Sequence, residues 1–414
     1  MSKQTYSSYK KILSNFNMHV TFSEPNLETI FDRKLLDGYQ LDLGYHVIGG
    51  GIISKIKDII PLENEDIEIF ESRLYEAKNG SYNYFVNNFE KLKMLPSVLR
   101  LFLSGEKVMK ELDNTSMNET IKKYAKGKTK IVLEVNSRLI TTINNLDLVS
   151  AGKVFRTQKD MGIKGVRYPK NGLSNVSNKL AEFIKKNKGK IFLNKPVEKI
   201  VIENNEAKGI IANGEKYSFD MVLSSILVQS LFTIADEKHF PEKYVKELKS
   251  LEGSGSLCAY YSFKNLKPDL IGKTFVFIER NVGIDGNDAV GMIDFMTAQP
   301  KAGLSPPSSY LVQSYIICTP KEAKDKNILE KLRKVLDKNL EKIIKNYKSN
   351  LNWVFYPAIW HLDGVAKTIL NEKPEIKTPV KNLYLVGDCV KAPGIGINCA
   401  INSAKIVAEM IGKI

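Results

Sequence analysis

The sequence predicts an α/β fold in which a domain assembled from separate stretches of the chain is interrupted by a second, α+β domain. Near its end, an apolar strand at 383–386 runs into Gly-Asp, a glycine-rich loop and an apolar-periodic stretch that ends at Ile411. In the middle, β-like segments alternate with turn signals, and at the start a helical run precedes an alternating one. A chain of 414 residues is long enough for more than one core.

The first residues predict the second half of a dinucleotide-binding βαβ unit. Apolar residues recur at helical spacing over 6–16, and alternating ones over 18–22 lead to Glu24. In such units this carboxylate binds the adenosine ribose and follows a glycine fingerprint by about 20 residues. The first glycine is Gly38, so the fingerprint is missing. A truncated or wrongly assigned start, a genuinely reduced protein and a partner chain that supplies the missing strand all fit this pattern.

The next stretch predicts a short strand beside a flat ligand. Tyr39, Leu41 and Leu43 alternate with polar residues, and Gly44, His46 and three further glycines follow. Glycines allow the backbone to approach a ligand closely. A histidine that is hydrogen-bonded within a turn is an equally good interpretation of His46.

The stretches 71–164 and 226–354 lack glycine motifs and are predicted to form the second domain. A regular amphipathic helix is expected over 328–344. Over 92–102, apolar residues mixed with lysine and arginine predict a helix that rests on a membrane surface or covers a substrate cavity. The aromatic stretch 353–365 contains both tryptophans, and it forms either a wall for an apolar substrate or an ordinary core strand.

Residues 165–225 predict a helix, a β-meander and a buried strand. Apolar residues recur at helical spacing from Val176 to Ile184, and turn signals follow at Asn204-Asn205 and Asn213-Gly214. An Asn-Gly pair between β-like segments is a strong hairpin signal. The expected strands are 197–203, 207–212, 216–219 and 220–225. By contrast, the glycine-rich Gly253 to Cys258 follows a helical stretch and precedes a strand, so it is interpreted as a turn.

The C-terminal loop predicts a binding site for an anion or another hydrogen-bond acceptor. The first N–H groups of a helix have no partner within it and carry the positive end of the helix dipole. They therefore point at whatever lies above the end of the preceding strand. The residues of this site are Gly387, Asp388, Gly394, Gly396, Ile397 and Asn398.

This C-terminal arrangement resembles the flavin signature of the phytoene desaturase and amine oxidase family of FAD-dependent oxidoreductases. The resemblance runs from residue 6 onward and is strongest at 35–48, 165–225 and 380–412. It implies a Rossmann-like FAD-binding domain with an incomplete first βαβ unit. That domain would comprise 1–70, 165–225 and 355–414, and the α+β substrate domain 71–164 and 226–354.

The resemblance also implies FAD as cofactor and a role for individual residues. Asp388 would hold a ribityl hydroxyl, and the backbone of Val197 would bind the adenine. The usual Gly-Gly-Arg is missing, which leaves Arg33 as the phosphate partner. The implied cofactor-binding residues are Glu24, Arg33, Gly44, His46, Val197, Gly387, Asp388, Gly394, Gly396, Ile397 and Asn398. No catalytic residue is indicated, since the flavin supplies the redox chemistry.

The implied function is desaturation, saturation or isomerisation of an apolar small-molecule substrate such as an isoprenoid. A flavin amine oxidase is an alternative, and so is a cofactor-free remnant that binds a lipid or a protein. A two-chain enzyme would be indicated by a short companion chain that carries a strand and the glycine fingerprint.

Composition and charge exclude some other classes of function and favour others. The net charge of +15 comes from lysines spread along the whole chain, which favours solvated faces, with peripheral contact to a membrane surface as the second interpretation. Basic and aromatic repeats are missing, so nucleic acid is not expected. Four scattered cysteines and four scattered histidines suggest neither a disulfide framework nor a metal site, and they fit a cytoplasmic location. No apolar run reaches the ~18 residues of a spanning helix, and no secretory signal is apparent.

Overall fold

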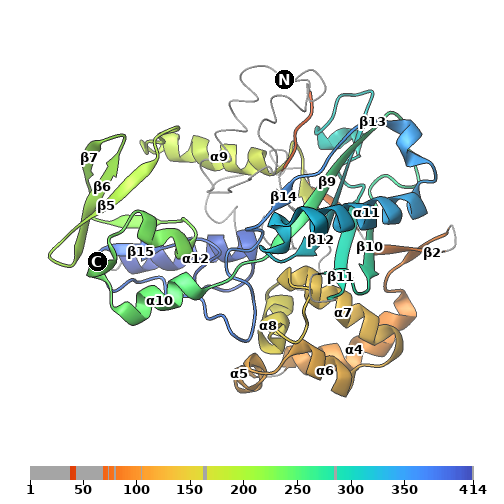
Figure 1. The fold of residues 1–414 in the computed structure, drawn as a ribbon, viewed down its shortest axis with the longest axis horizontal. Helices are drawn as coiled ribbons and strands as arrows, with labels where there is room; N and C mark the ends of the chain where they lie inside the picture. The colour runs from red at the N-terminus through yellow and green to blue at the C-terminus, as the bar shows by residue number, and fades with distance from the viewer. Residues whose placement is uncertain are drawn as a thin grey trace.

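The computed structural model describes residues 38–42, 69–72, 74–78, 81–103, 105–161, 166–283 and 287–412. They form a mixed α/β molecule, which confirms the predicted fold class (Figure 1). The helix and strand predicted over 6–22 lie outside the described residues, as do Glu24, Arg33, Gly44 and His46. The division into two domains stays a prediction.

An eight-stranded sheet dominates one part of the molecule. Its order is β13-β9-β12-β11-β10-β2-β3, with β14 paired to β9, and β10 and β2 form its parallel pair. All nine residues of β9 are buried, because its side chains alternate between two core clusters, with Cys258 and Tyr260 on one face and Leu257, Ala259 and Tyr261 on the other. The strands are β2 (Leu74–Lys78), β3 (Ser81–Tyr84), β9 (Gly255–Phe263), β10 (Thr274–Glu279), β11 (Ala289–Asp294), β12 (Tyr310–Cys318), β13 (Leu351–Phe355) and β14 (Ala358–Ile359).

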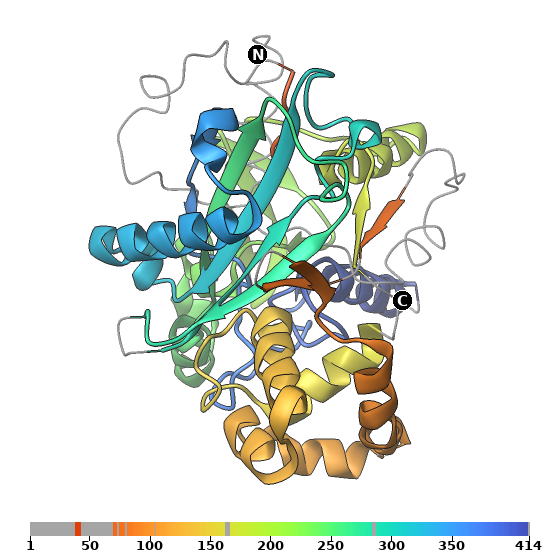
Figure 2. The same ribbon diagram turned by 90° about the vertical axis from the view of Figure 1, so that its right-hand side faces the viewer.

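Helix α11 (Lys326–Ile343) crosses one face of this sheet, as Figures 1 and 2 show. It confirms the predicted amphipathic helix. Asp325 caps its start by accepting hydrogen bonds from the amides of Asn327 and Ile328. Leu332, Leu336 and Leu340 are buried at intervals of four residues, so one apolar stripe packs on the sheet.

Five helices follow β3 and pack together below the sheet in Figure 1. Helix α7 contacts β10 and β11, and α5 packs on α8. Ser116 and Glu119 form a reciprocal capping box at the start of α6. The helices are α4 (Asn88–Leu103), α5 (Glu106–Asp113), α6 (Met117–Tyr124), α7 (Gly127–Thr141) and α8 (Ala151–Met161).

The other part of the molecule contains the predicted β-meander and the strands predicted at 220–225 and 383–386. Strand β8 pairs in parallel with β15, and both predicted turns of the meander have left-handed backbone at their central residues. The strands are β1 (Ile69–Ser72), β4 (Val166–Pro169), β5 (Val197–Glu203), β6 (Glu206–Ala212), β7 (Glu215–Ser218), β8 (Val222–Ser224) and β15 (Leu383–Leu385). The helices are α9 (Leu173–Lys186), α10 (Glu242–Ser250) and α12 (Gly396–Ile411).

The short strand predicted around Tyr39 is wrong for the part that the structure describes. Tyr39 and Leu41 are buried as their alternation suggested, but residues 39–42 belong to no strand. A backbone bond from Gln40 N–H to the carbonyl of Leu304 at 2.9 Å ties the segment to the rest of the fold. Alternation reports burial of one face, whereas a strand also needs a ladder of hydrogen bonds.

Asp294, at the end of β11, should make stability depend on pH. It is buried, and burial raises its pKa from 3.8 to about 6, although its Oδ1 accepts hydrogen bonds from Thr274 and the amide of Met296. Because the pKa of Asp294 is higher in the folded state than in the unfolded state, its protonation stabilises the fold below pH 4. This stabilisation is lost as pH rises through 6. The loss amounts to about 3 kcal/mol.

Asp294→Asn keeps an oxygen for both bonds and cannot ionise. Its stability advantage over wild type, measured by urea unfolding, should grow between pH 4 and pH 8. Equal pH slopes for the two proteins would contradict this assignment.

Candidate functional site

The candidate site lies where β15 runs into α12. We define the cofactor loop as residues 387–395. Gly387, Gly394 and the following Gly396 have φ angles of 117°, 90° and 47°, which other residues adopt at a cost. Among the described residues, a side-chain carbon added at Gly396 would meet no atom within 4 Å, and one added at Gly387 would meet only the Ser225 carbonyl at 4.0 Å. The described part of the chain therefore leaves room for a ligand against the backbone at both glycines.

Helix α12 begins beside this space without a side-chain cap. Its N-cap residue is Ile395, whose carbonyl accepts from the amides of Asn398 and Cys399. The amides of Gly396 and Ile397 precede the first intrahelical donors, and Ile397 is 40% exposed. This helix start can donate hydrogen bonds to an anionic or carbonyl group of a ligand.

The end of β15 is fixed by its neighbours. The amide of Val386 donates to the carbonyl of Ser224 at 2.9 Å, which extends the parallel pairing. The amide of Gly387 donates to Oγ of Ser403 on α12, also at 2.9 Å. The strand end and the helix are thereby held in one rigid unit.

Asp388 supplies the carboxyl group of the site. Its Oδ1 accepts a weak hydrogen bond from the Cys389 thiol at 3.4 Å. Burial, and after it the nearby Asp363 carboxylate, raises the pKa of Asp388, while Lys373 opposes the shift. The carboxyl group thus takes up a proton at higher pH than an exposed aspartate does.

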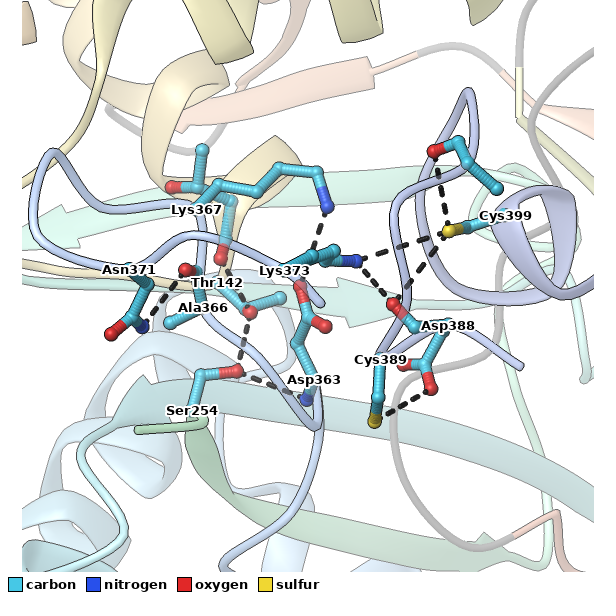
Figure 3. A network of polar contacts seen from close by, with 12 residues as sticks. Thr142, Ser254, Asp363, Ala366, Lys367, Asn371, Lys373, Asp388, Cys389 and Cys399 are labelled. Atoms are coloured by element: carbon cyan, nitrogen blue, oxygen red, sulfur yellow. Dashed lines mark hydrogen bonds and ion pairs between the residues drawn. The ribbon is translucent and has the colours of Figure 1, made fainter. Parts of the chain in front are cut away.

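Charged residues on a neighbouring segment lie on one side of Asp388 (Figure 3). We call this segment, residues 361–373, the strap. Asp363 and Lys367 are buried and form an ion pair at 3.7 Å, and burial lowers the pKa of Lys367. Lys373 donates to the carbonyl of Asp388 and lies 3.9 Å from the Cys399 sulfur.

Sequence reasoning missed these three charged residues. The chain contains 61 lysines and arginines, so no single lysine stands out. One signal could have identified Asp363 and Lys367: a lysine follows an acid by four residues within an otherwise apolar stretch.

The structure brings together the six C-terminal residues that the sequence predicted. Gly387, Asp388 and Gly394 lie in the cofactor loop, while Gly396, Ile397 and Asn398 open α12. Val197 lies apart from them, half exposed, at the start of β5. Of the aromatic stretch at 353–365, Trp353 packs in the sheet core, edge-on to Tyr39 with ring centroids 4.9 Å apart.

These residues fit a flavin dinucleotide. An open glycine loop admits a ligand against the backbone, the helix start donates hydrogen bonds, and Asp388 offers an acceptor for hydroxyl groups. Among the described residues, no cluster of His, Cys, Asp or Glu has the arrangement of a metal site.

Comparison with known proteins agrees with this chemistry. The model of the flavin containing amine oxidoreductases matches residues 139–411, which is more than half of the chain. A curated relative is a 1-hydroxycarotenoid 3,4-desaturase from Flavobacterium sp., 24% identical over 279 residues. That alignment covers 60% of this chain and 55% of the desaturase, so it spans only about half the length of the relative.

Two solved structures show the same fold. An oxidoreductase from Methanosarcina mazei has a TM-score of 0.70 at 20% identity and covers 90% of this chain and 89% of its own. A putrescine oxidase has a TM-score of 0.60 at 11% identity, with 90% and 88% covered.

The fold and the site therefore match the class of flavin-binding proteins. The chain belongs to the family of flavin containing amine oxidoreductases. This confirms the resemblance and the cofactor that the sequence predicted.

Proposed function

We propose that this protein is an FAD-dependent oxidoreductase that acts on an apolar substrate. The uncapped start of α12 beside Asp388 and the open cofactor loop is the observation that carries the proposal. When bound, FAD accepts or donates a hydride equivalent. The chain's own residues would hold the ribityl chain at Asp388 and place the positive helix end where reduction adds negative charge.

Substrate class is proposed from the relative. The carotenoid desaturase suggests a long apolar polyene as substrate. Desaturation is therefore preferred to amine oxidation. Tyr39, Tyr260 and Trp353 are buried in the sheet core and are not assigned to the substrate.

Anaerobic reduction of the bound flavin tests this choice. The protein loaded with FAD is mixed separately with a hydroxylated carotenoid in detergent and with putrescine. The proposal expects the visible flavin band to bleach with the carotenoid only. Bleaching with putrescine only would establish the amine oxidase alternative, and bleaching with neither would reject both substrates.

We also propose a peripheral contact with a membrane surface, through α4. Phe89, Leu92 and Leu103 are 65%, 67% and 83% exposed, and Lys91 and Lys93 flank the first two. Apolar and basic residues on one helix suit an anionic bilayer surface. In the part of the chain that the structure describes, no helix is long and apolar enough to cross a bilayer.

The double variant Phe89→Ser, Leu92→Ser should bind vesicles of mixed phosphatidylcholine and phosphatidylserine more weakly. Burying one large apolar side chain contributes about 1.5–3 kcal/mol, so a loss of at least tenfold is expected in co-sedimentation. Phe219→Ser removes a half-exposed aromatic ring and serves as the control, because Phe219 directly follows β7, which lies on the opposite side of the molecule from α4 in Figure 1. Equal binding by both variants would reject the contact.

A further inference from the structure

We propose that Lys373 is a positioning residue, which holds the cofactor loop in its binding shape through the carbonyl of Asp388. It lies beside the loop, on the strap, and donates its hydrogen bond to a backbone oxygen (Figure 3). A bond to the backbone orients the peptide while the Asp388 carboxyl group stays available. The role in cofactor binding rests on the proposed function, but the shape of the loop does not.

The loop closes around the thiol of Cys399. This fully buried side chain lies 3.6 Å from the carbonyls of Asp388 and Val390 and 3.4 Å from that of Ala392. A thiol has one weak donor and cannot satisfy three carbonyls. Lys373, 3.9 Å from the same sulfur, adds the strong donor that this cluster needs.

The charge on Lys373 is maintained by the acids around it. Burial alone lowers the pKa of a lysine, but the Asp363 carboxylate, then Cys399 and Asp388, outweigh that effect, and the pKa of Lys373 is raised. An ammonium group donates stronger hydrogen bonds than a neutral donor does. The bond to the Asp388 carbonyl is therefore charge-assisted at neutral pH.

The backbone that carries Lys373 is held in place by contacts that do not involve the cofactor loop. Lys153 on α8 donates to the carbonyls of Thr368 and Asn371 at 2.7 and 2.5 Å. The side-chain Nδ2 of Asn371 donates to the carbonyl of Glu252 at 2.9 Å. The strap is thus tied to two other elements, so Lys373 reaches the loop from a fixed support.

Hydrogen exchange of the full, ligand-free chain tests this directly. The amide of Gly387, bonded to Ser403, reports opening of the loop. Lys373→Met should speed exchange at 386–392 about tenfold while leaving β9 unchanged. Lys373→Arg retains a charged donor and should restore protection. Lys391→Met removes an exposed lysine of the same loop, paired with Glu372 and Glu375, and should exchange like wild type.

A second measurement follows the cofactor. Lys373→Met should weaken FAD binding about tenfold and shift the bound flavin spectrum, and Lys373→Arg should reverse both changes. Unchanged exchange at 386–392 in Lys373→Met, equal acceleration in β9, or no rescue by arginine would each overturn the proposal. If the wild type binds no FAD, the proposed function fails, and the exchange result still decides the role of Lys373.

Discussion

Asp388→Asn is expected to weaken FAD binding roughly thirtyfold. The asparagine keeps the size of the side chain and an oxygen for the Cys389 thiol, but it loses the charge that strengthens bonds from the ribityl hydroxyls. A hydrogen bond to a charged group contributes about 2 kcal/mol, which corresponds to this factor. Quenching of flavin fluorescence during titration measures the dissociation constant.

Glu375→Gln is the matched control for this substitution. Glu375 is an exposed carboxylate that pairs with Lys391 of the cofactor loop at 2.8 Å. This substitution also removes one negative charge close to the loop. The affinity for FAD should nevertheless stay within about twofold of wild type, because surface ion pairs contribute little free energy. If Asp388→Asn binds FAD as tightly as wild type, the assignment of Asp388 to the cofactor is wrong.

Gly364→Ala should have the second large effect, on both stability and cofactor binding. The added methyl carbon would lie 2.2 Å from the Cys389 sulfur and 2.9 Å from Cδ2 of Leu227. Overpacking of this kind costs about 1–3 kcal/mol, so the melting temperature should fall by roughly 5 °C. Because Cys389 follows Asp388, the displaced loop should also bind FAD less tightly.

A second substitution separates this clash from a general loss of stability. Cys389→Ala removes the sulfur, so the double variant Gly364→Ala, Cys389→Ala should recover most of the lost stability and affinity. Gly105→Ala adds a methyl group where no atom of the described residues lies within 4 Å, and it should melt close to wild type. Thermal melts and FAD titrations of all four proteins test this. A double variant no better than Gly364→Ala would show that the clash is not the cause.

Local signals in the sequence were sufficient for the elements around the site. The Asn213-Gly214 pair predicted the hairpin between β6 and β7, because both residues adopt left-handed backbone there. The strand, Gly-Asp and glycine loop predicted β15 and α12, since these elements follow each other directly in the chain. Such structures are determined by interactions between residues that are close in the sequence, and these can be recognised in a single sequence.

Contacts between distant segments could not be predicted in this way. Asp42 accepts hydrogen bonds from the Leu173 amide at the start of α9 and from the Tyr168 hydroxyl, at 2.7 and 2.5 Å. Sequence rules look for a capping residue directly before the helix. Asp42, which accepts the bond from the first turn of α9, lies 131 residues away in the sequence. The bond from Lys373 to Asp388 could not be predicted for a similar reason, because the two residues come together only in the folded strap.

The visible spectrum of the chain after incubation with FAD and gel filtration tests the central claim most directly. A flavin that binds at Asp388 and α12 should stay with the protein and show the resolved absorption band of a bound isoalloxazine ring, and Asp388→Asn should retain less of it. A protein that emerges without flavin after saturation with FAD would contradict the claim, and would favour a cofactor-free protein that binds a lipid or a partner.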